Sequence, residues 1–423
     1  MLHRRASALL LCLLSVTALA SGLSPAERRI ADAAERRQEA AIELLARAVD
    51  IDSPTEDLAG VRAVGDLFAA ELRGIGMQVE WIDMPPEMKR AGHLVARSHG
   101  RHGKRVLMLG HLDTVLSGER FRREGQRGYG TGIDDMKGGL VVMLLALQSL
   151  HDAGMLADAR VDVMLTGDEE DAGSPLSVSR EPMLALARKG DVVLGFEAAY
   201  EGTITIGRRG AGAWTLETRG QTGHSSQIFS AEKGSAAVFE AARILEAFHA
   251  ELSGERYLTI NPSLIVGGTT ARIDGFAGRA EGKNNVIPPV AQVLGDIRFI
   301  SLEQEKATRE RMQAIVARHH PGTSASIVFD ESYPAMTPTP GNQKLLHALD
   351  AVSRELGQGG VEALDPSRRG AGDIGFVAHL LPGLDGLGSA GGANAHAAGE
   401  YTDLGSIVPM AQRTAVLLHR LTR

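Results

Sequence analysis

The stretch VLMLGHLDTV, residues 106–115, places a short apolar run directly before a histidine and an aspartate. The apolar residues 106–109 predict a buried strand, as in a sheet that is covered on both faces. In an extended chain residues two apart share a face, so His111 and Asp113 are predicted to be neighbours. A carboxylate beside a metal-bound imidazole fixes its tautomer, but a histidine with a purely structural role fits this pair equally well.

Strands and helices alternate on both sides of this stretch. Short apolar strands that alternate with helices predict an α/β domain with a mostly parallel sheet. The pattern predicts helices over residues 25–49, 58–72 and 138–150, and further strands over residues 77–82, 161–165 and 192–196.

The middle of the chain has a different pattern, β-α-β-β-α-β, which is the ferredoxin-like order. It predicts strands over 211–218, 257–266, 290–300 and 325–329 and helices over 235–252 and 303–318. The α/β pattern then resumes, with helices near 343–356 and 407–421. The sequence therefore predicts an α+β domain, residues 208–325, inserted between the two parts of an α/β domain, residues 21–207 and 326–423.

The composition is that of a globular protein of more than one domain. The chain has 423 residues, 43 % hydrophobic and 23 % charged, with a net charge of −7. A length above about 300 residues favours two domains. No long run of lysine or arginine occurs, so nucleic acid is not expected as a partner.

The N-terminus has the pattern of a secretory signal peptide over residues 1–20. Arg4 and Arg5 precede an apolar stretch that ends at Ala18-Leu19-Ala20. These are a basic start, an apolar centre and a small-residue cleavage site. The structural alternative is a buried N-terminal helix. A signal peptide predicts a periplasmic or secreted protein that is free of the membrane after cleavage, and cleavage would remove Cys12, the only cysteine.

Four further segments carry acidic or histidine residues beside predicted strands or helices. Each has a structural alternative when it is taken alone: helix capping by the aspartates, a solvated acidic loop, a buried glutamate with a partner, or a surface histidine. The segments are GTGIDDMKGG (130–139), TGDEE (166–170), Glu197 after the strand at 192–196, and GGANAHAAGEY (391–401).

Taken together, these segments point to a metal centre. Ligands of open α/β sheets gather at the carboxyl ends of the strands. Two histidines and three carboxylates suit two Zn²⁺ ions with one bridging carboxylate, and the absence of cysteine ligands favours a hydrolytic site over a closed structural one. The predicted ligands are His111, Asp135, Glu170, Glu197 and His396.

The segments GHLDTV, GTGIDDMKGG, TGDEE, GFE and AHAAGEY, in this order, resemble the co-catalytic zinc family of glutamate carboxypeptidase, succinyl-diaminopimelate desuccinylase, acetylornithine deacetylase and aminoacylase. The resemblance spans essentially the whole mature chain and is greatest to the bacterial secreted glutamate carboxypeptidases. It implies that Asp135 bridges two ions, one held also by His111 and Glu197, the other by Glu170 and His396. Co²⁺ or Mn²⁺ are alternative metals.

The resemblance also implies a reaction. Glu169 would be the general base and Asp113 would orient His111. The expected enzyme is a secreted dizinc metallocarboxypeptidase that cleaves the amide bond next to a free C-terminal carboxylate of a small peptide. An N-acyl-amino-acid deacylase is the alternative, and a catalytically inactive binding protein is the alternative of another class. A zinc aminopeptidase is disfavoured by the inserted domain.

For the inserted domain the resemblance implies a lid that also forms a homodimer, through an edge strand around 257–266. His224 would reach the active site of the partner subunit, while Asn285 and Arg298 would contact substrate. A surface histidine and a salt-bridged arginine are the structural alternatives for His224 and Arg298.

Two segments depart from the family pattern. Arg369-Gly370-Ala371-Gly372-Asp373 replaces a GGGTD-like turn that lines the substrate pocket, which places Gly370 there. Asp330-Glu331-Ser332-Tyr333 stands where the glutamate-specific relative has basic residues before a Pro-Ala pair. Glutamate specificity is therefore not implied. Arg208 and Arg209 could supply substitute positive charge or could be solvated.

Overall fold

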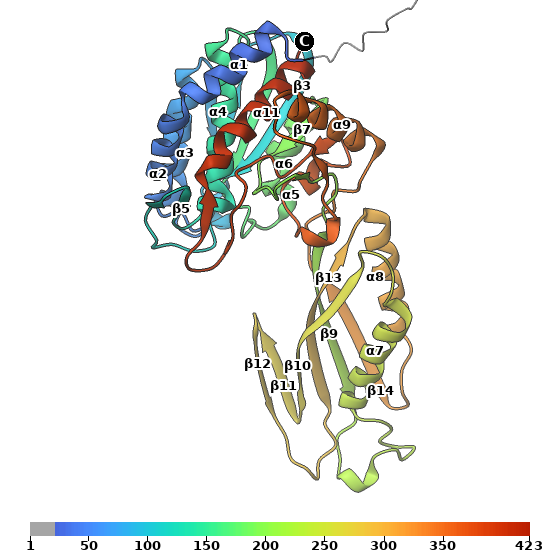
Figure 1. Cartoon of the computed structure of the whole chain (residues 1–423). Helices are drawn as coiled ribbons and strands as arrows, with labels where there is room; N and C mark the ends of the chain where they lie inside the picture. The colour runs from blue at the N-terminus through green and yellow to red at the C-terminus, as the bar shows by residue number, and fades with distance from the viewer. Residues whose placement is uncertain (1–21) are drawn as a thin grey trace, which may run out of the picture.

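The computed structural model describes residues 22–423, so the signal peptide predicted over residues 1–20 lies outside the described residues. The chain builds two units, one around a broad sheet and one long and narrow (Figure 1). The narrow unit projects from one end of the other. After the roles that the resemblance implies, we call the narrow unit the lid and the other the catalytic unit.

The catalytic unit is built on a six-stranded sheet of order β1-β2-β6-β3-β7-β16. β3 pairs in parallel with β6 and β7, and β7 with β16, whereas β1 and β2 are antiparallel. The mostly parallel sheet predicted from the sequence is confirmed, and β2 and β16 are additions to it. The strands are β1 (Gln78–Ile82), β2 (His93–Arg97), β3 (His102–His111), β6 (Ala159–Thr166), β7 (Val192–Gly195) and β16 (Gly383–Leu384).

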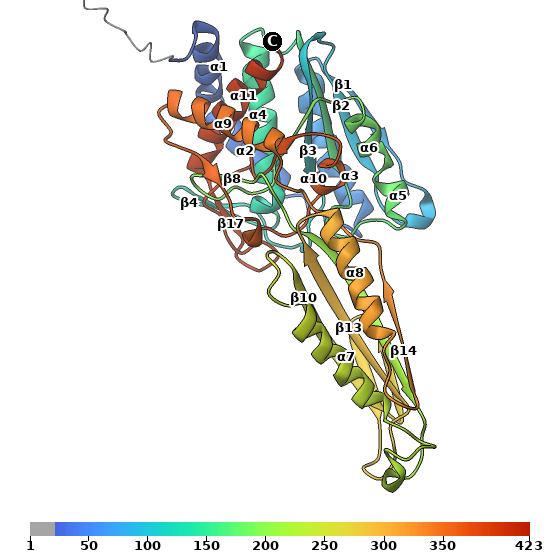
Figure 2. The same ribbon diagram turned by 90° about the vertical axis from the view of Figure 1, so that its right-hand side faces the viewer.

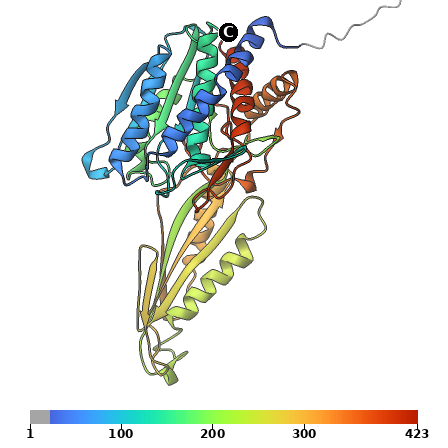
Figure 3. The same cartoon turned by 60° about the vertical axis from the view of Figure 1, so that its left-hand side comes forward.

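Helices cover both faces of this sheet (Figures 2 and 3). Met108 of β3 packs into the core under one set, and its neighbours Leu107 and Leu109 pack into a second core under the other. Alternate burial on two faces explains the continuous apolar run of this strand. The first set is α1 (Pro25–Arg36), α2 (Gln38–Val49), α3 (Leu58–Gly74), α4 (Gly138–Asp152), α9 (Pro340–Glu355) and α11 (Ile407–Leu421), and the second is α5 (Leu176–Ser179), α6 (Glu181–Ala187) and α10 (Ile374–Val377).

The single helix predicted over residues 25–49 is wrong. The chain forms two helices, α1 and α2, because the backbone at Arg37 leaves the helical conformation with φ −99° and ψ 5°. The Arg37 guanidinium reaches Asp152 at the end of α4, with Nε 2.6 Å from Oδ2. Apolar periodicity does not detect such a bend, because buried apolar residues recur every three or four positions on both sides of it.

The lid is a four-stranded antiparallel sheet of order β10-β13-β9-β14, with α7 and α8 on one face (Figures 1 and 2). Its elements follow the predicted β-α-β-β-α-β order. Trp214 and Phe248 lie at the centre of its core, with ring centroids 5.7 Å apart. The elements are β9 (Gly210–Gly220), α7 (Ala237–Leu252), β10 (Thr259–Gly268), β13 (Val290–Phe299), α8 (Leu302–Val316) and β14 (Thr323–Phe329).

A hairpin that the sequence pattern did not predict, β11 (Thr270–Asp274) and β12 (Ala277–Glu281), packs on the other face of the lid sheet (Figure 1). Two small sheets complete the catalytic unit. None of the described helices is both long and apolar enough to span a membrane. The small sheets comprise β4 (Arg122–Glu124), β5 (Arg127–Tyr129) and β17 (Tyr401–Asp403), and β8 (Thr203–Ile204) with β15 (Glu362–Ala363).

Two chain segments join the units and pair with each other. Arg208 pairs with Met336, and Ala211 pairs with Tyr333, in isolated antiparallel bridges. The segment that enters the lid and the segment that leaves it therefore form one short, hydrogen-bonded connection, which we call the lid connection.

Candidate metal centre

Strand ends bring the predicted ligands together. β3, β6 and β7 are parallel neighbours, so their carboxyl ends meet at one edge of the sheet. His111 is the last residue of β3, and Glu170 and Glu197 follow the ends of β6 and β7. Asp135 lies in a turn that precedes α4, and His396 in a loop before β17.

Asp135 lies between the two histidines. Its Oδ1 is 3.2 Å from His111 Nε2, and its Oδ2 is 3.1 Å from His396 Nε2. Glu197 Oε1 is 3.9 Å from His111 Nε2, and Glu170 Oε1 is 3.2 Å from His396 Nε2. The five side chains thus form two groups that share Asp135, the division that the resemblance implies.

The residues fit a pair of divalent cations. Ligand atoms about 2.0–2.1 Å from a tetrahedral zinc ion are about 3.3 Å apart, close to the separations around Asp135. Donor atoms of His111, Asp135 and Glu170 all lie within 4.8 Å of one another. Glu170 Oε1 is buried, and among residues 22–423 it pairs with the His396 ring. Imidazoles and carboxylates without thiolates are the donors of a hydrolytic site.

The electrostatics also favour cations. Burial raises the pKa of Glu170, and raises that of Glu197 to about 7 although the Arg208 guanidinium opposes it. The hydrogen bond to Asp135 raises the pKa of His396 to about 10. A bound cation would stabilise the ionised form of these buried carboxylates and would take the place of the proton on the imidazole.

Asp113 links His111 to the loop that follows β6. His111 Nδ1 is 3.0 Å from the Asp113 carbonyl oxygen and 3.5 Å from its Oδ1, so Nε2 is left facing Asp135. The Asp113 carboxylate accepts the backbone N–H groups of Glu169 at 3.0 Å and Glu170 at 3.1 Å. Thr55 Oγ1 donates to it at 2.7 Å, a contact that the sequence analysis missed.

The turn that carries Asp135 is held by Glu400, whose role the sequence analysis also missed. The buried Glu400 carboxylate accepts the backbone N–H groups of Gly132 at 2.7 Å, Asp134 at 2.8 Å and Asp135 at 2.9 Å. The peptide bond between Asp135 and Met136 is cis. A glutamate four residues after His396 was visible in the sequence, but nothing there showed which turn it reaches.

Glu169 lies half-buried beside this centre. Burial raises its pKa well above the ordinary value, and the nearby Glu197 and Glu170 carboxylates act in the same direction. A carboxylate with a raised pKa that is not needed as a ligand is suited to accept and release a proton.

Arg208 and Arg209, the two arginines that could supply positive charge, have different surroundings. Arg208 is buried: its Nη1 is 2.5 Å from Asp385 Oδ2 and 3.8 Å from Glu197 Oε1, and its Nε donates to the Gly370 carbonyl at 2.9 Å. Arg209 donates to the Ser367 carbonyl at 3.2 Å. Arg208 therefore forms part of the wall of the metal centre.

Arg369, the departure in the pocket-lining turn, is also buried. Its guanidinium donates to the Ala198 carbonyl and, at 3.2 Å, to Thr205 Oγ1. Gly370, the predicted pocket residue, is exposed. This turn therefore packs behind the strand end that carries Glu197.

The predicted lid residues lie apart from these ligands. His224 belongs to the segment between β9 and α7, and this segment forms the end of the lid farthest from the catalytic unit (Figure 1). It is exposed, and its Nδ1 is 2.8 Å from Ser226 Oγ. The carbonyl of Asn285 accepts the Ser225 N–H at 3.0 Å, which places Asn285 in the same region. Arg298 of β13 is half-exposed and pairs with Asp296, with Nε 2.9 Å from Oδ2.

A parallel sheet with imidazoles and carboxylates gathered at its strand ends is the arrangement of a metal-dependent hydrolase. The family model described as peptidase family M20/M25/M40 matches residues 107–420. The chain therefore belongs to this family, and it is a metal-dependent hydrolase that acts on amide bonds.

Relatives span almost the whole chain. Carboxypeptidase G2 of Pseudomonas sp. (strain RS-16) is 27 % identical and covers 96 % of this chain and 95 % of its own length. Succinyl-diaminopimelate desuccinylase of Gluconacetobacter diazotrophicus is 27 % identical and covers 85 % of this chain and 91 % of its own length.

Solved structures share the fold. Aminopeptidase PepT from Bacillus cereus has a TM-score of 0.70 at 17 % identity and covers 91 % of this chain and 99 % of its own. A Bacillus subtilis protein described as a dinuclear metal binding peptidase from the M20 family has a TM-score of 0.66 at 15 % identity. The match covers 92 % of this chain and 99 % of that protein.

We predict that Glu400→Gln lowers metal affinity by about 10–100-fold, a cost typical of lost support for a ligand. The amide cannot accept all three N–H groups, because its own NH₂ donates, so the Asp135 turn loses an anchor. Titration calorimetry of the metal-free protein with Zn²⁺ measures the change. Glu124→Gln, an exposed glutamate in the adjoining small sheet, is the control. Equal affinity in the two variants would contradict this role for Glu400.

Proposed function

We propose that this protein is a secreted dizinc hydrolase that cleaves the amide bond next to a free C-terminal carboxylate, as a metallocarboxypeptidase of small peptides does. The observation that carries the proposal is the position of Asp135, with one oxygen toward His111 and the other toward His396. The relative named as a carboxypeptidase, aligned over 96 % of this chain, supports the reaction class.

The predicted ligands would hold two zinc ions, which lower the pKa of water and polarise the scissile carbonyl. Glu169 takes a proton from the attacking water and passes it to the leaving nitrogen, which departs only when protonated. Asp113 keeps the His111 ring in the tautomer that presents Nε2. Arg208, 3.8 Å from Glu197, limits the movement of that carboxylate.

The second candidate is an N-acyl-amino-acid deacylase. A relative named as a desuccinylase, aligned over 85 % of this chain, favours it. Both reactions break an amide next to an amino acid and need the same groups. The aminopeptidase that was disfavoured because of the inserted domain returns as an alternative, because a structure described as an aminopeptidase shares the fold over 91 % of this chain. Retention of Glu169 beside Glu170 argues against an inactive binding protein.

The location and the metal also belong to the proposal. The basic and apolar start of the chain, with its small-residue cleavage site, supports export to the periplasm or beyond. Two imidazoles and three carboxylates support zinc, and they also suit Co²⁺ or Mn²⁺.

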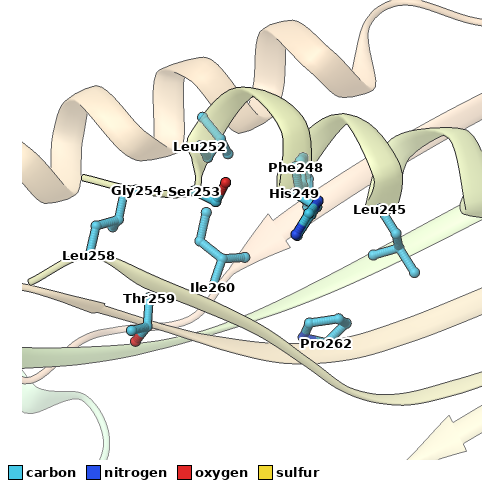
Figure 4. A pocket seen from close by; sticks show the side chains of 10 residues that line it. All are labelled: Leu245, Phe248, His249, Leu252, Ser253, Gly254, Leu258, Thr259, Ile260 and Pro262. Carbon is cyan, nitrogen blue, oxygen red and sulfur yellow. The ribbon is translucent and has the colours of Figure 1, made fainter. Parts of the chain in front are cut away.

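We further propose a homodimer formed through the lid. β10 is an edge strand of the lid sheet, and an open edge can pair with its own copy across a two-fold axis. A cavity of about 330 Å³ lies beside it, between the end of α7 and the start of β10, and its walls include Leu245, Phe248 and Ile260 (Figure 4). His224 lies in a loop away from the metal ligands of its own chain. In the dimer it would donate a hydrogen bond to the oxyanion in the partner's active site.

Metal removal and a substrate panel test the reaction. We expect chelation to abolish hydrolysis, Zn²⁺ or Co²⁺ to restore it, and elemental analysis to find about two ions per chain. The panel contains dipeptides and N-acyl amino acids, each with a matched C-terminal amide. Loss of turnover on the amides supports the carboxylate requirement. Full turnover by metal-free protein, or equal turnover of acids and amides, would contradict the proposal.

Glu169→Gln tests the proton acceptor. We expect the variant to bind both ions, because Glu169 is not a predicted ligand, and to lose at least about 100-fold in kcat. Glu310→Gln, an exposed glutamate on α8 of the lid, is a matched control that keeps the rate. A Glu169→Gln enzyme with near-normal kcat would show that the base lies elsewhere.

Mixing two inactive variants tests the dimer. Glu169→Gln and His224→Ala chains are exchanged under conditions that dissociate subunits. A mixed dimer then places one intact Glu169 centre opposite one intact His224, so activity should rise above that of either variant. Sedimentation measures association in the same samples. Activity that stays at background in proven mixed dimers, or a protein that is only monomeric, would rule the arrangement out.

A further inference from the structure

Tyr333 belongs to the 330–333 segment that departs from the family pattern, and the proposed reaction gives it no role. Its hydroxyl donates to the backbone carbonyl of Glu169 at 2.7 Å. Its own backbone lies in the lid connection, where its N–H donates to Ala211 at 2.9 Å and its carbonyl accepts the Ala211 N–H at 3.0 Å. Tyr333 therefore joins the lid connection to the residue proposed as the base.

The contact fixes one particular peptide group, the one between Glu169 and Glu170. Tyr333 holds its carbonyl, and Asp113 holds its N–H, with Oδ2 3.1 Å from the Glu170 nitrogen. A peptide group is planar, so anchors on both sides fix its orientation. The Glu169 and Glu170 side chains flank this peptide group, so its orientation sets the direction of both.

A buried ionic network keeps Tyr333 in place. Arg180, 1 % exposed, donates to Asp168 Oδ1 at 2.6 Å and to the Asp168 carbonyl at 3.0 Å, and its Nε is 2.9 Å from Asp373 Oδ1. The Tyr333 ring packs against Phe376, with centroids 5.1 Å apart, and Arg180 lies 5.9 Å from its centroid. The hydroxyl therefore reaches the loop from a rigid position.

We propose that Tyr333 is a positioning residue for Glu169, which it serves by holding the 169–170 peptide group from the lid connection. This inference rests on the proposed role of Glu169. The hydroxyl touches neither a predicted ligand side chain nor the reacting atoms, so its effect passes through the base. Loss of the hydroxyl leaves Asp113 as the single anchor of the peptide group, and the carboxylate then spends less time in the reactive orientation.

Tyr333→Phe removes the hydroxyl and keeps the ring. We expect kcat on the best substrate of the panel to fall about tenfold, with KM within about twofold and both ions bound. Amide hydrogen exchange in the segment 166–173 should become about fivefold faster, because one hydrogen bond is lost there. The matched control is Tyr129→Phe: Tyr129 is also half-buried and also packs against an arginine and a second aromatic ring, Arg122 and Tyr401.

A double variant separates positioning from a general structural role. In the Glu169→Gln background, Tyr333→Phe should cause no further loss of kcat, because a residue that acts through the base has nothing left to position. A full tenfold loss in that background, or an unchanged kcat in the single variant, would overturn the inference. An active Glu169→Gln enzyme would instead refute the proposed base, so the two failures are distinguishable.

Discussion

Negative charge gathered at the ends of buried strands is the constraint on which the rest of this structure depends. Asp135, Glu170 and Glu197 lie among apolar strands where a lone carboxylate is costly. Burial raises the pKa of Glu197 to about 7, and the nearby Asp135 carboxylate acts in the same direction. A bound cation would stabilise the ionised carboxylates, so metal binding and the local fold are coupled.

Four of the five predicted ligands are held by charged side chains outside the ligand set. Glu400 fixes the turn of Asp135 through three backbone N–H groups, and Asp113 ties His111 to the loop that carries Glu170. Arg208, paired with Asp385, faces Glu197 from the lid connection. Because these supports are buried and charged, hydrogen bonds to them are short and directional, and small changes in them are expected to reach the ligands.

The lid connection relates the two units to the chemistry. One of its segments carries Arg208 toward Glu197, and the other carries Tyr333 toward the Glu169 carbonyl. Both contacts reach the catalytic unit from the lid connection, whereas His224 and Asn285 belong to neighbouring loops of the lid, after β9 and before β13. A single chain thus assembles the metal ligands and the proposed base but keeps its distal lid residues away from them, which is why the proposed dimer would complete the site.

The sequence by itself determined the α/β sheet, the β-α-β-β-α-β insertion and the ligand candidates, because apolar periodicity and strand-end residues are local signals. It did not determine the bend at Arg37, the added hairpin or the inner strand β2. Only the tertiary structure decided that Glu400 supports Asp135, that Thr55 supports Asp113, and that Arg208 is buried rather than solvated. These contacts join residues from 58 to 265 positions apart. Their partners follow from how helices and strands pack in space, which residue order does not record.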